Sequence, residues 1–187
     1  MKADFAISTD FSAMLAVMNN TDATEFNPNN NYTLGGQIGY KTTYLNVLYG
    51  QQGIGVDPTF QLDLTAGYDL SEKFYLGINA SYNETGVASF YGAALYPKLA
   101  ISDKFEMGLR TEYFVEKNGG VGAIGAYDAA GSANILATTL TASYILGDLT
   151  IKPEIRFDLN SEDAFLKADL SPSNQLGSFV LAAIYSF

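Results

Sequence analysis

Hydrophobic and polar residues alternate one by one along most of this 187-residue chain. The alternation is clearest at residues 147–161, where the sequence reads GDLTIKPEIRFDLNS. Lys152, Glu154, Arg156 and Asp158 occupy every second position there, and apolar residues lie between them. Because successive strand side chains point to opposite faces, this segment predicts a β-strand with one charged face and one apolar face.

The same two-residue period recurs along the chain and predicts about ten strands. The clear segments are 4–18, 32–41, 60–70, 74–83, 105–115 and 135–146, and the weaker ones are 44–52, 89–102 and 176–187. Many of these segments have about ten or more residues, the length that a tilted strand needs to cross the hydrocarbon core of a membrane. Strands of soluble proteins are more often about five or six residues long. The pattern therefore favours membrane-spanning strands.

Short polar turns alternate with connections that are mostly longer. The short turns are KTT at 41–43, SEK at 71–73, SDK at 102–104 and GDL at 147–149. The other connections are 21–30, 55–58, 84–87, 116–134 and 162–175. Short turns at one end and longer loops at the other predict a single all-β domain over residues 1–187, an up-and-down antiparallel β-barrel. An even number of strands places both termini at the short-turn end.

The composition places the apolar strand faces in lipid. Charged residues make up 16% of the chain, whereas 48% is hydrophobic and 13% aromatic. Soluble domains contain roughly 25% charged residues. A closed barrel satisfies every backbone hydrogen bond, so its apolar face can contact lipid while its charged face lines a lumen. A soluble β-sandwich is the alternative.

The location and the partners follow from the barrel. We expect a mature protein of the bacterial outer membrane, because the N-terminal residues lack the apolar segment of a secretory signal peptide. Its partners are then the lipid bilayer and ions or small solutes, and the sequence indicates no particular protein partner. The net charge of −10 and the sequence pI of about 4.2 argue against binding to nucleic acid.

Catalytic chemistry finds little support in the sequence. Histidine and cysteine are absent, which removes the commonest general base, the commonest metal ligand and any thiolate site. Glu154 and Asp158, four residues apart on one strand, are separated by about 13 Å, too far to act as a catalytic carboxylate pair. Residues 120–125, GVGAIG, fit the G-x-G-x-x-G spacing of dinucleotide sites, but no helix-forming segment follows, so a loop is predicted. We expect no enzymatic activity, no cofactor and no metal.

The C-terminal third carries a family resemblance. The strand that contains Pro153, Glu154, Arg156 and Asp158 is followed by an acidic loop with Phe165 and by a last strand that ends in phenylalanine. Over roughly residues 135–187 this arrangement resembles the OmpL-like putative β-barrel porin-2 family of outer-membrane proteins. The resemblance implies a porin role. It leaves open whether the chain corresponds to a C-terminal portion, a short natural relative or an engineered, reduced barrel.

The charged face supplies the candidate functional residues. The residues predicted to line the lumen are Asp10, Gln37, Asp63, Asp69, Lys98, Glu106, Arg110, Glu112, Lys152, Glu154, Arg156 and Asp158. With Lys41 counted among the bases, acids outnumber bases by about two, which favours a weakly cation-preferring channel if water fills the lumen. The long connections 116–134 and 162–175 are the candidate gates. The alternative is a non-conducting structural or interaction barrel, whose charges pair across the lumen and fill it.

Overall fold

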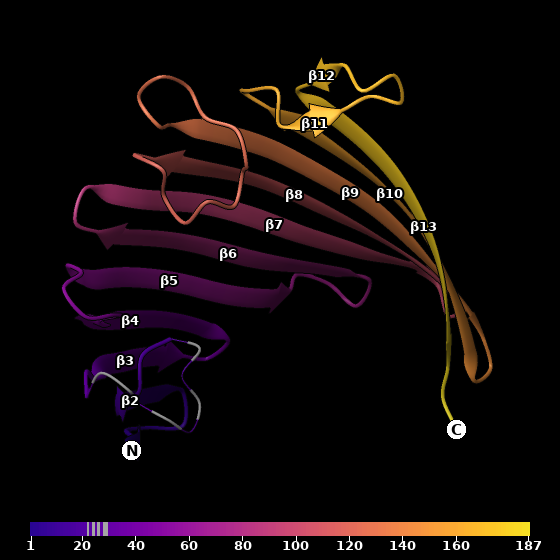
Figure 1. Ribbon diagram of the computed structural model, residues 1–187. Coiled ribbons are helices and arrows are strands. Elements are labelled where there is room, and N and C mark those ends of the chain that lie inside the picture. The colour runs from indigo at the N-terminus through magenta and orange to yellow at the C-terminus, as the bar shows by residue number, and fades with distance from the viewer. Residues whose placement is uncertain (22, 24, 26, 28–29) are drawn as a thin grey trace.

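The computed structural model describes residues 1–21, 23, 25, 27 and 30–187. Part of the predicted 21–30 loop, residues 22, 24, 26, 28 and 29, therefore lies outside the described residues. Over the described ranges the protein is all β, and eleven strands form one curved antiparallel sheet in sequence order (Figure 1). No helix that could cross a membrane occurs in this part of the chain.

The strands of the sheet are long in the middle of the chain and short at its start. They are β1 (Lys2–Ala6), β2 (Phe11–Met18), β3 (Thr33–Tyr40), β4 (Thr43–Gln51), β5 (Pro58–Asp69), β6 (Phe74–Thr85), β7 (Ala88–Ser102), β8 (Phe105–Lys117), β9 (Ala133–Leu146), β10 (Leu149–Asn160) and β13 (Gln175–Tyr185). Between β10 and β13, β11 (Phe165–Leu166) and β12 (Pro172–Ser173) form a separate small hairpin. Strands β5 to β10 have 12 to 15 residues each, long enough to span a membrane when tilted.

The segment 4–18, predicted as one strand, is two strands, β1 and β2, joined by a turn at residues 7–10. The Ser8 hydroxyl oxygen accepts hydrogen bonds from the backbone N–H groups of Asp10 and Phe11, at 3.3 and 3.1 Å. Such a serine offers the backbone a local partner that competes with the strand ladder. Ser8, Thr9 and Asp10 interrupt the alternation, but it resumes after them in the same phase, so the period alone did not reveal the turn. The sheet thus has eleven strands in the described residues, one more than predicted.

Apart from the two-residue connection 86–87 between β6 and β7, the short turns lie at one end of the sheet, as predicted. They connect β1 to β2, β3 to β4, β5 to β6, β7 to β8 and β9 to β10. We call this end the turn end and the opposite end, which holds the 118–132 and 161–174 connections, the loop end. The odd strand number places the N-terminus at the loop end and the C-terminus at the turn end, where the Ser186 N–H bonds the Asp148 carbonyl oxygen. The prediction that both termini lie at the turn end is therefore wrong.

Strand register confirms the two predicted faces. Residues paired across an antiparallel ladder point to the same side, and Gln37, Asn46 and Asp63 form one such row across β3, β4 and β5. The adjacent row, on the other side, contains Ile38 and Leu45. The same alternation continues through β6 to β10. One face of the sheet therefore carries the polar and charged residues, and the other carries the apolar ones.

The polar face is the concave one. Buried strand residues lie mainly on this face, as Thr33, Thr59 and Thr139 do, because side chains on the inside of a curved sheet cover one another. Large apolar side chains on the opposite face are exposed, including Ile38 at 52% and Phe157 at 64%. An exposed apolar surface of this extent is typical of a surface that contacts lipid.

The sheet is open, whereas the sequence predicts a closed barrel. Among the described residues no ladder joins β1 to β13, so these two strands form free edges. The five residues of β1 offer few hydrogen-bonding groups to the eleven-residue β13. The curved wall of a barrel is therefore seen, but not its closure (Figure 1).

Candidate lumen-lining site

Eleven of the twelve residues predicted to line the lumen lie on the concave face. They are Gln37 on β3, Asp63 and Asp69 on β5, Lys98 on β7, Glu106, Arg110 and Glu112 on β8, and Lys152, Glu154, Arg156 and Asp158 on β10. Asp10 lies instead in the turn between β1 and β2, with its side chain 53% exposed and its carboxylate 3.9 Å from the Lys41 ammonium group. This pair marks the turn end of the concave face.

A row of amides holds the Asp63 carboxylate on the concave face. Gln37 Nε2 donates to Asn46 Oδ1 at 2.7 Å, and Asn46 Nδ2 donates to Asp63 Oδ1 at 3.2 Å. From the other side, Asn79 Nδ2 donates to Asp63 Oδ2 at 3.0 Å. Both carboxylate oxygens thus accept hydrogen bonds from neutral groups, and within the described residues no lysine or arginine forms an ion pair with Asp63. Its negative charge is positioned but not neutralised.

Arg156 and Asp158 form an ion pair along one strand, two residues apart on the same face of β10. Arg156 Nε donates to the two Asp158 carboxylate oxygens at 2.9 and 3.0 Å, and Nη2 lies 2.9 Å from Oδ1. The Asp158 side chain is only 9% exposed, whereas that of Arg156 is 34% exposed. The arginine therefore compensates a carboxylate that is almost fully removed from water.

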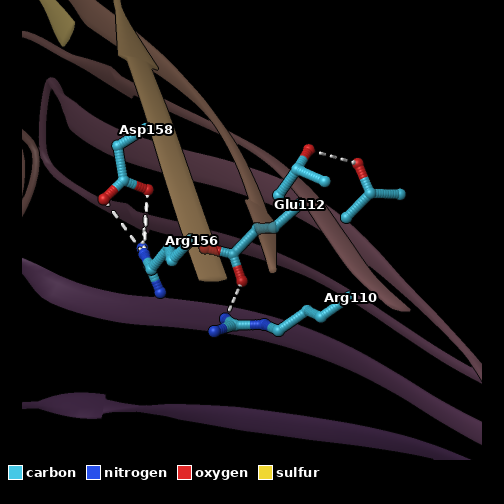
Figure 2. Close-up of polar contacts among 6 residues, drawn as sticks. Arg110, Glu112, Arg156 and Asp158 are labelled. Carbon is cyan, nitrogen blue, oxygen red and sulfur yellow. Dashed lines mark hydrogen bonds and ion pairs between the residues drawn. The ribbon is translucent and has the colours of Figure 1, made fainter. Parts of the chain in front are cut away.

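A second pair of the same kind, Arg110 and Glu112, lies on β8. The Arg110 guanidinium contacts the Glu112 carboxylate, and the two pairs lie level across β9, with Thr139 between the arginines. Figure 2 shows the four side chains projecting from β8 and β10 on the same side of the sheet. In both strands the arginine and an acid two residues later lie on the same face, so the acid neutralises the charge of the arginine.

Local pairing leaves a surplus of acids. Besides the two arginine pairs, the Lys98 ammonium lies 3.8 Å from the Glu106 carboxylate on the neighbouring strand. Of the predicted lining charges on the described strands, Asp63, Asp69, Glu154 and Lys152 then have no ion-pair partner. Three acids against one base leave this face net negative.

Cavities next to these charges lie on the concave face. One of about 240 Å³ is bordered by Asp63, Asn46 and Gln61. Another, of about 350 Å³, is bordered by Lys98 and Arg110 among others. Both volumes exceed the roughly 30 Å³ that one water molecule occupies in the liquid, so water can reach these side chains.

Sequence reasoning missed Glu116, near the loop end of β8. Its side chain is fully buried, and its carboxylate accepts hydrogen bonds from the N–H groups of Val121, Ala123 and Ile124 at 2.7, 3.2 and 2.9 Å. The Tyr127 hydroxyl donates a fourth at 2.7 Å. The one signal in the sequence was the G-x-G-x-x-G spacing of residues 120–125, which supplies the backbone that wraps around this carboxylate.

The N–H groups that a dinucleotide phosphate would need are bound by Glu116. In a dinucleotide site the N–H groups of a G-x-G-x-x-G loop face a phosphate, whereas here three N–H groups of residues 121–124 face the protein's own carboxylate. Burial of the Tyr127 hydroxyl and its hydrogen bond to Glu116 raise the pKa of Tyr127, so that the hydroxyl keeps its proton. Across the described residues, histidine, cysteine, aspartate and glutamate do not gather in groups of three or more that could hold a metal ion.

The membrane-type β-wall and its charged concave face define the class of protein: an outer-membrane β-barrel. A comparison with known families matches residues 1–187 to the family described as putative beta-barrel porin-2, OmpL-like. The chain belongs to this family, and the match covers the whole chain, not only residues 135–187 where the sequence resemblance was recognised. No curated protein was found to match. The family assigns a porin-type role in the outer membrane, with association to the membrane and small solutes, and points to a channel and not to an enzyme.

Proposed function

We propose that the protein is a small porin-like channel for ions or small solutes, and that Asp63, Asp69 and Glu154 give it a weak preference for cations. The observation that carries this proposal is the acid surplus on the concave face, where the other lining acids in strands are paired with bases. A wall of low dielectric constant focuses the field of unpaired charges into the passage, so a small surplus affects ion permeation.

The geometry of the ion pairs favours a channel over a filled barrel. Each pair joins residues of one strand or of neighbouring strands, so the side chains lie along the wall. Charges already paired along the wall in this way are not available to bridge the lumen as a plug. The second candidate function, a non-conducting structural or interaction barrel, therefore has less support.

Replacing Asp63 by lysine tests the lining assignment. In water, a unit charge about 10 Å from a permeating ion contributes about 0.4 kcal/mol, and this substitution changes the charge by two units. The permeability of the cation is therefore expected to fall about fourfold and that of the anion to rise about fourfold, so their ratio should fall about sixteenfold. The measurement is the reversal potential of single channels in a planar bilayer under a potassium chloride gradient.

Glu72→Lys is the matched control, because Glu72 lies in the exposed turn between β5 and β6 and changes the charge by the same amount. Its reversal potential should stay close to that of the unaltered protein. Channels of the Asp63 variant that conduct with an unshifted reversal potential would remove Asp63 from the lining. A folded, unaltered protein that never conducts would instead support the non-conducting barrel.

A further inference from the structure

The connection between β8 and β9, residues 118–132, folds onto the concave face. Glu116 faces this side, because its ladder partners Phe90 and Ala133 belong to the concave rows of β7 and β9. Since the loop's N–H groups bind the Glu116 side chain, the loop lies over the same face. Figure 1 shows this connection bent back toward the strands instead of extending away from them.

The loop is a folded unit with a closed neck. The Gly119 N–H donates to the Gly131 carbonyl oxygen at 2.7 Å, and Asn118 Nδ2 donates to the Val87 carbonyl oxygen at 2.7 Å. On the β9 side of the neck, Asp128 Oδ1 accepts hydrogen bonds from the N–H groups of Ala130 and Ser132, at 2.9 and 2.8 Å. The neck fixes where the loop leaves the sheet, and Glu116 fixes how far it tilts inward.

Close contact between the loop and Glu116 requires glycine at position 120. Gly120 has a φ of +44°, and a Cβ atom there would lie 2.7 to 2.9 Å from atoms of the Glu116 side chain. A larger residue would have to push the loop away from the carboxylate or strain the backbone.

We propose that Glu116 is a positioning residue that holds the 118–132 loop against the concave face and thereby sets the width of the passage. This proposal rests on the proposed channel function. Four donors surround the carboxylate, and the loop's own charged residue, Asp128, is engaged by loop N–H groups. These neutral donors hold the two carboxylates but do not cancel their charges, so the loop narrows the passage and adds to its negative charge.

Glu116→Gln removes the charge and places an amide NH₂ among groups that are themselves donors. The loop should detach and be cleaved by a broad-specificity protease about tenfold faster or more, the factor that corresponds to the loss of one charge-assisted hydrogen bond of about 1.4 kcal/mol. Single-channel conductance should rise, while the reversal potential under a salt gradient should change less than in Asp63→Lys.

Glu112→Gln is the matched control, since Glu112 lies on the same face of β8 but is bound by Arg110 and not by the loop. Its loop should be cleaved at the rate of the unaltered protein. Gly120→Ala displaces the loop without altering any strand residue, and it should reproduce the effects of Glu116→Gln if that variant fails to fold.

The rate of loop cleavage tests whether Glu116 holds the loop, and the conductance tests whether the loop sets the width of the passage. Unchanged cleavage of the loop in both Glu116→Gln and Gly120→Ala would overturn the role of Glu116. Faster cleavage with unchanged conductance would show that the loop is held but does not set the width, which also overturns the proposal and leaves the channel intact. If neither the unaltered protein nor the variants conduct, the channel function itself fails, and the cleavage rates still report whether Glu116 holds the loop.

Discussion

Replacement of Leu140 by arginine is expected to destabilise the folded protein in a lipid bilayer by about 2 to 4 kcal/mol. Leu140 lies near the middle of β9 on the apolar face, in register with Leu109 and Ile155 on the neighbouring strands. An arginine at this depth places a full charge in hydrocarbon, where water solvates it poorly. The measurement is the free energy of unfolding, from urea titration of protein refolded into phosphatidylcholine vesicles.

Thr141→Arg is the control for this prediction, because position 141 adjoins Leu140 but faces the concave side. The Thr141 hydroxyl donates to Glu154 at 2.8 Å, and opposite it Gly108 leaves open space, since a Cβ there would meet no atom within 4 Å. An arginine at 141 can extend into this space and pair with Glu154, so the free energy should change by less than about 1 kcal/mol. Equal losses in the two variants would contradict the placement of the apolar face in lipid.

Replacement of Arg156 by alanine is expected to cost about 2 to 3 kcal/mol of unfolding free energy. Removing one partner of a fully buried ion pair costs about 3 to 5 kcal/mol. The value here is lower because the Arg156 side chain is 34% exposed, although Asp158, left without its cation, is only 9% exposed. The same urea titration in vesicles measures the loss.

Two comparisons test whether the unpaired charge of Asp158 causes the loss of unfolding free energy in Arg156→Ala. Lys98→Ala breaks the more exposed Lys98–Glu106 pair and should cost about 1 kcal/mol or less. The double variant Arg156→Ala, Asp158→Asn replaces the carboxylate by a neutral amide and should recover part of the stability. If Arg156→Ala and Lys98→Ala cost the same, the Arg156–Asp158 pair is not the structural element that its burial indicates.

The two faces of the sheet could be predicted from the sequence because strand geometry has a fixed period of two. Once Asp63 and Glu154 are assigned to strands, their side relative to the neighbouring apolar residues follows without knowledge of the tertiary structure. Eleven of the twelve residues predicted to line a lumen therefore share one face of the sheet, the concave one. The exception, Asp10, lies in the missed turn between β1 and β2, where the Ser8 hydroxyl binds the local backbone and the alternation resumes in the same phase after the turn.

Pairing and loop contacts were less accessible to sequence reasoning. Which lining charges neutralise one another depends on side-chain rotamers and on strand register, so the local pair of Arg156 with Asp158 could not be told from a pair across the lumen. Glu116 was overlooked because its partners come from a loop whose conformation depends on glycines with positive φ. The G-x-G-x-x-G spacing of residues 120–125 suggests a phosphate site, but the N–H groups of this loop bind Glu116 of the preceding strand.

The odd number of strands in the described sheet has a consequence for the seam of the barrel. Since β1 and β13 run in the same direction, a ladder formed directly between them would be parallel, with evenly spaced and slanted hydrogen bonds, beside neighbours that are all antiparallel. A barrel wall with only antiparallel ladders requires an odd number of further strands between these two edges. The perimeter then holds an even number of strands, whereas a direct β1–β13 seam leaves it odd. Whether β1 and β13 pair directly as parallel strands therefore decides if the barrel has an odd or an even number of strands. The number of strands in turn sets its circumference.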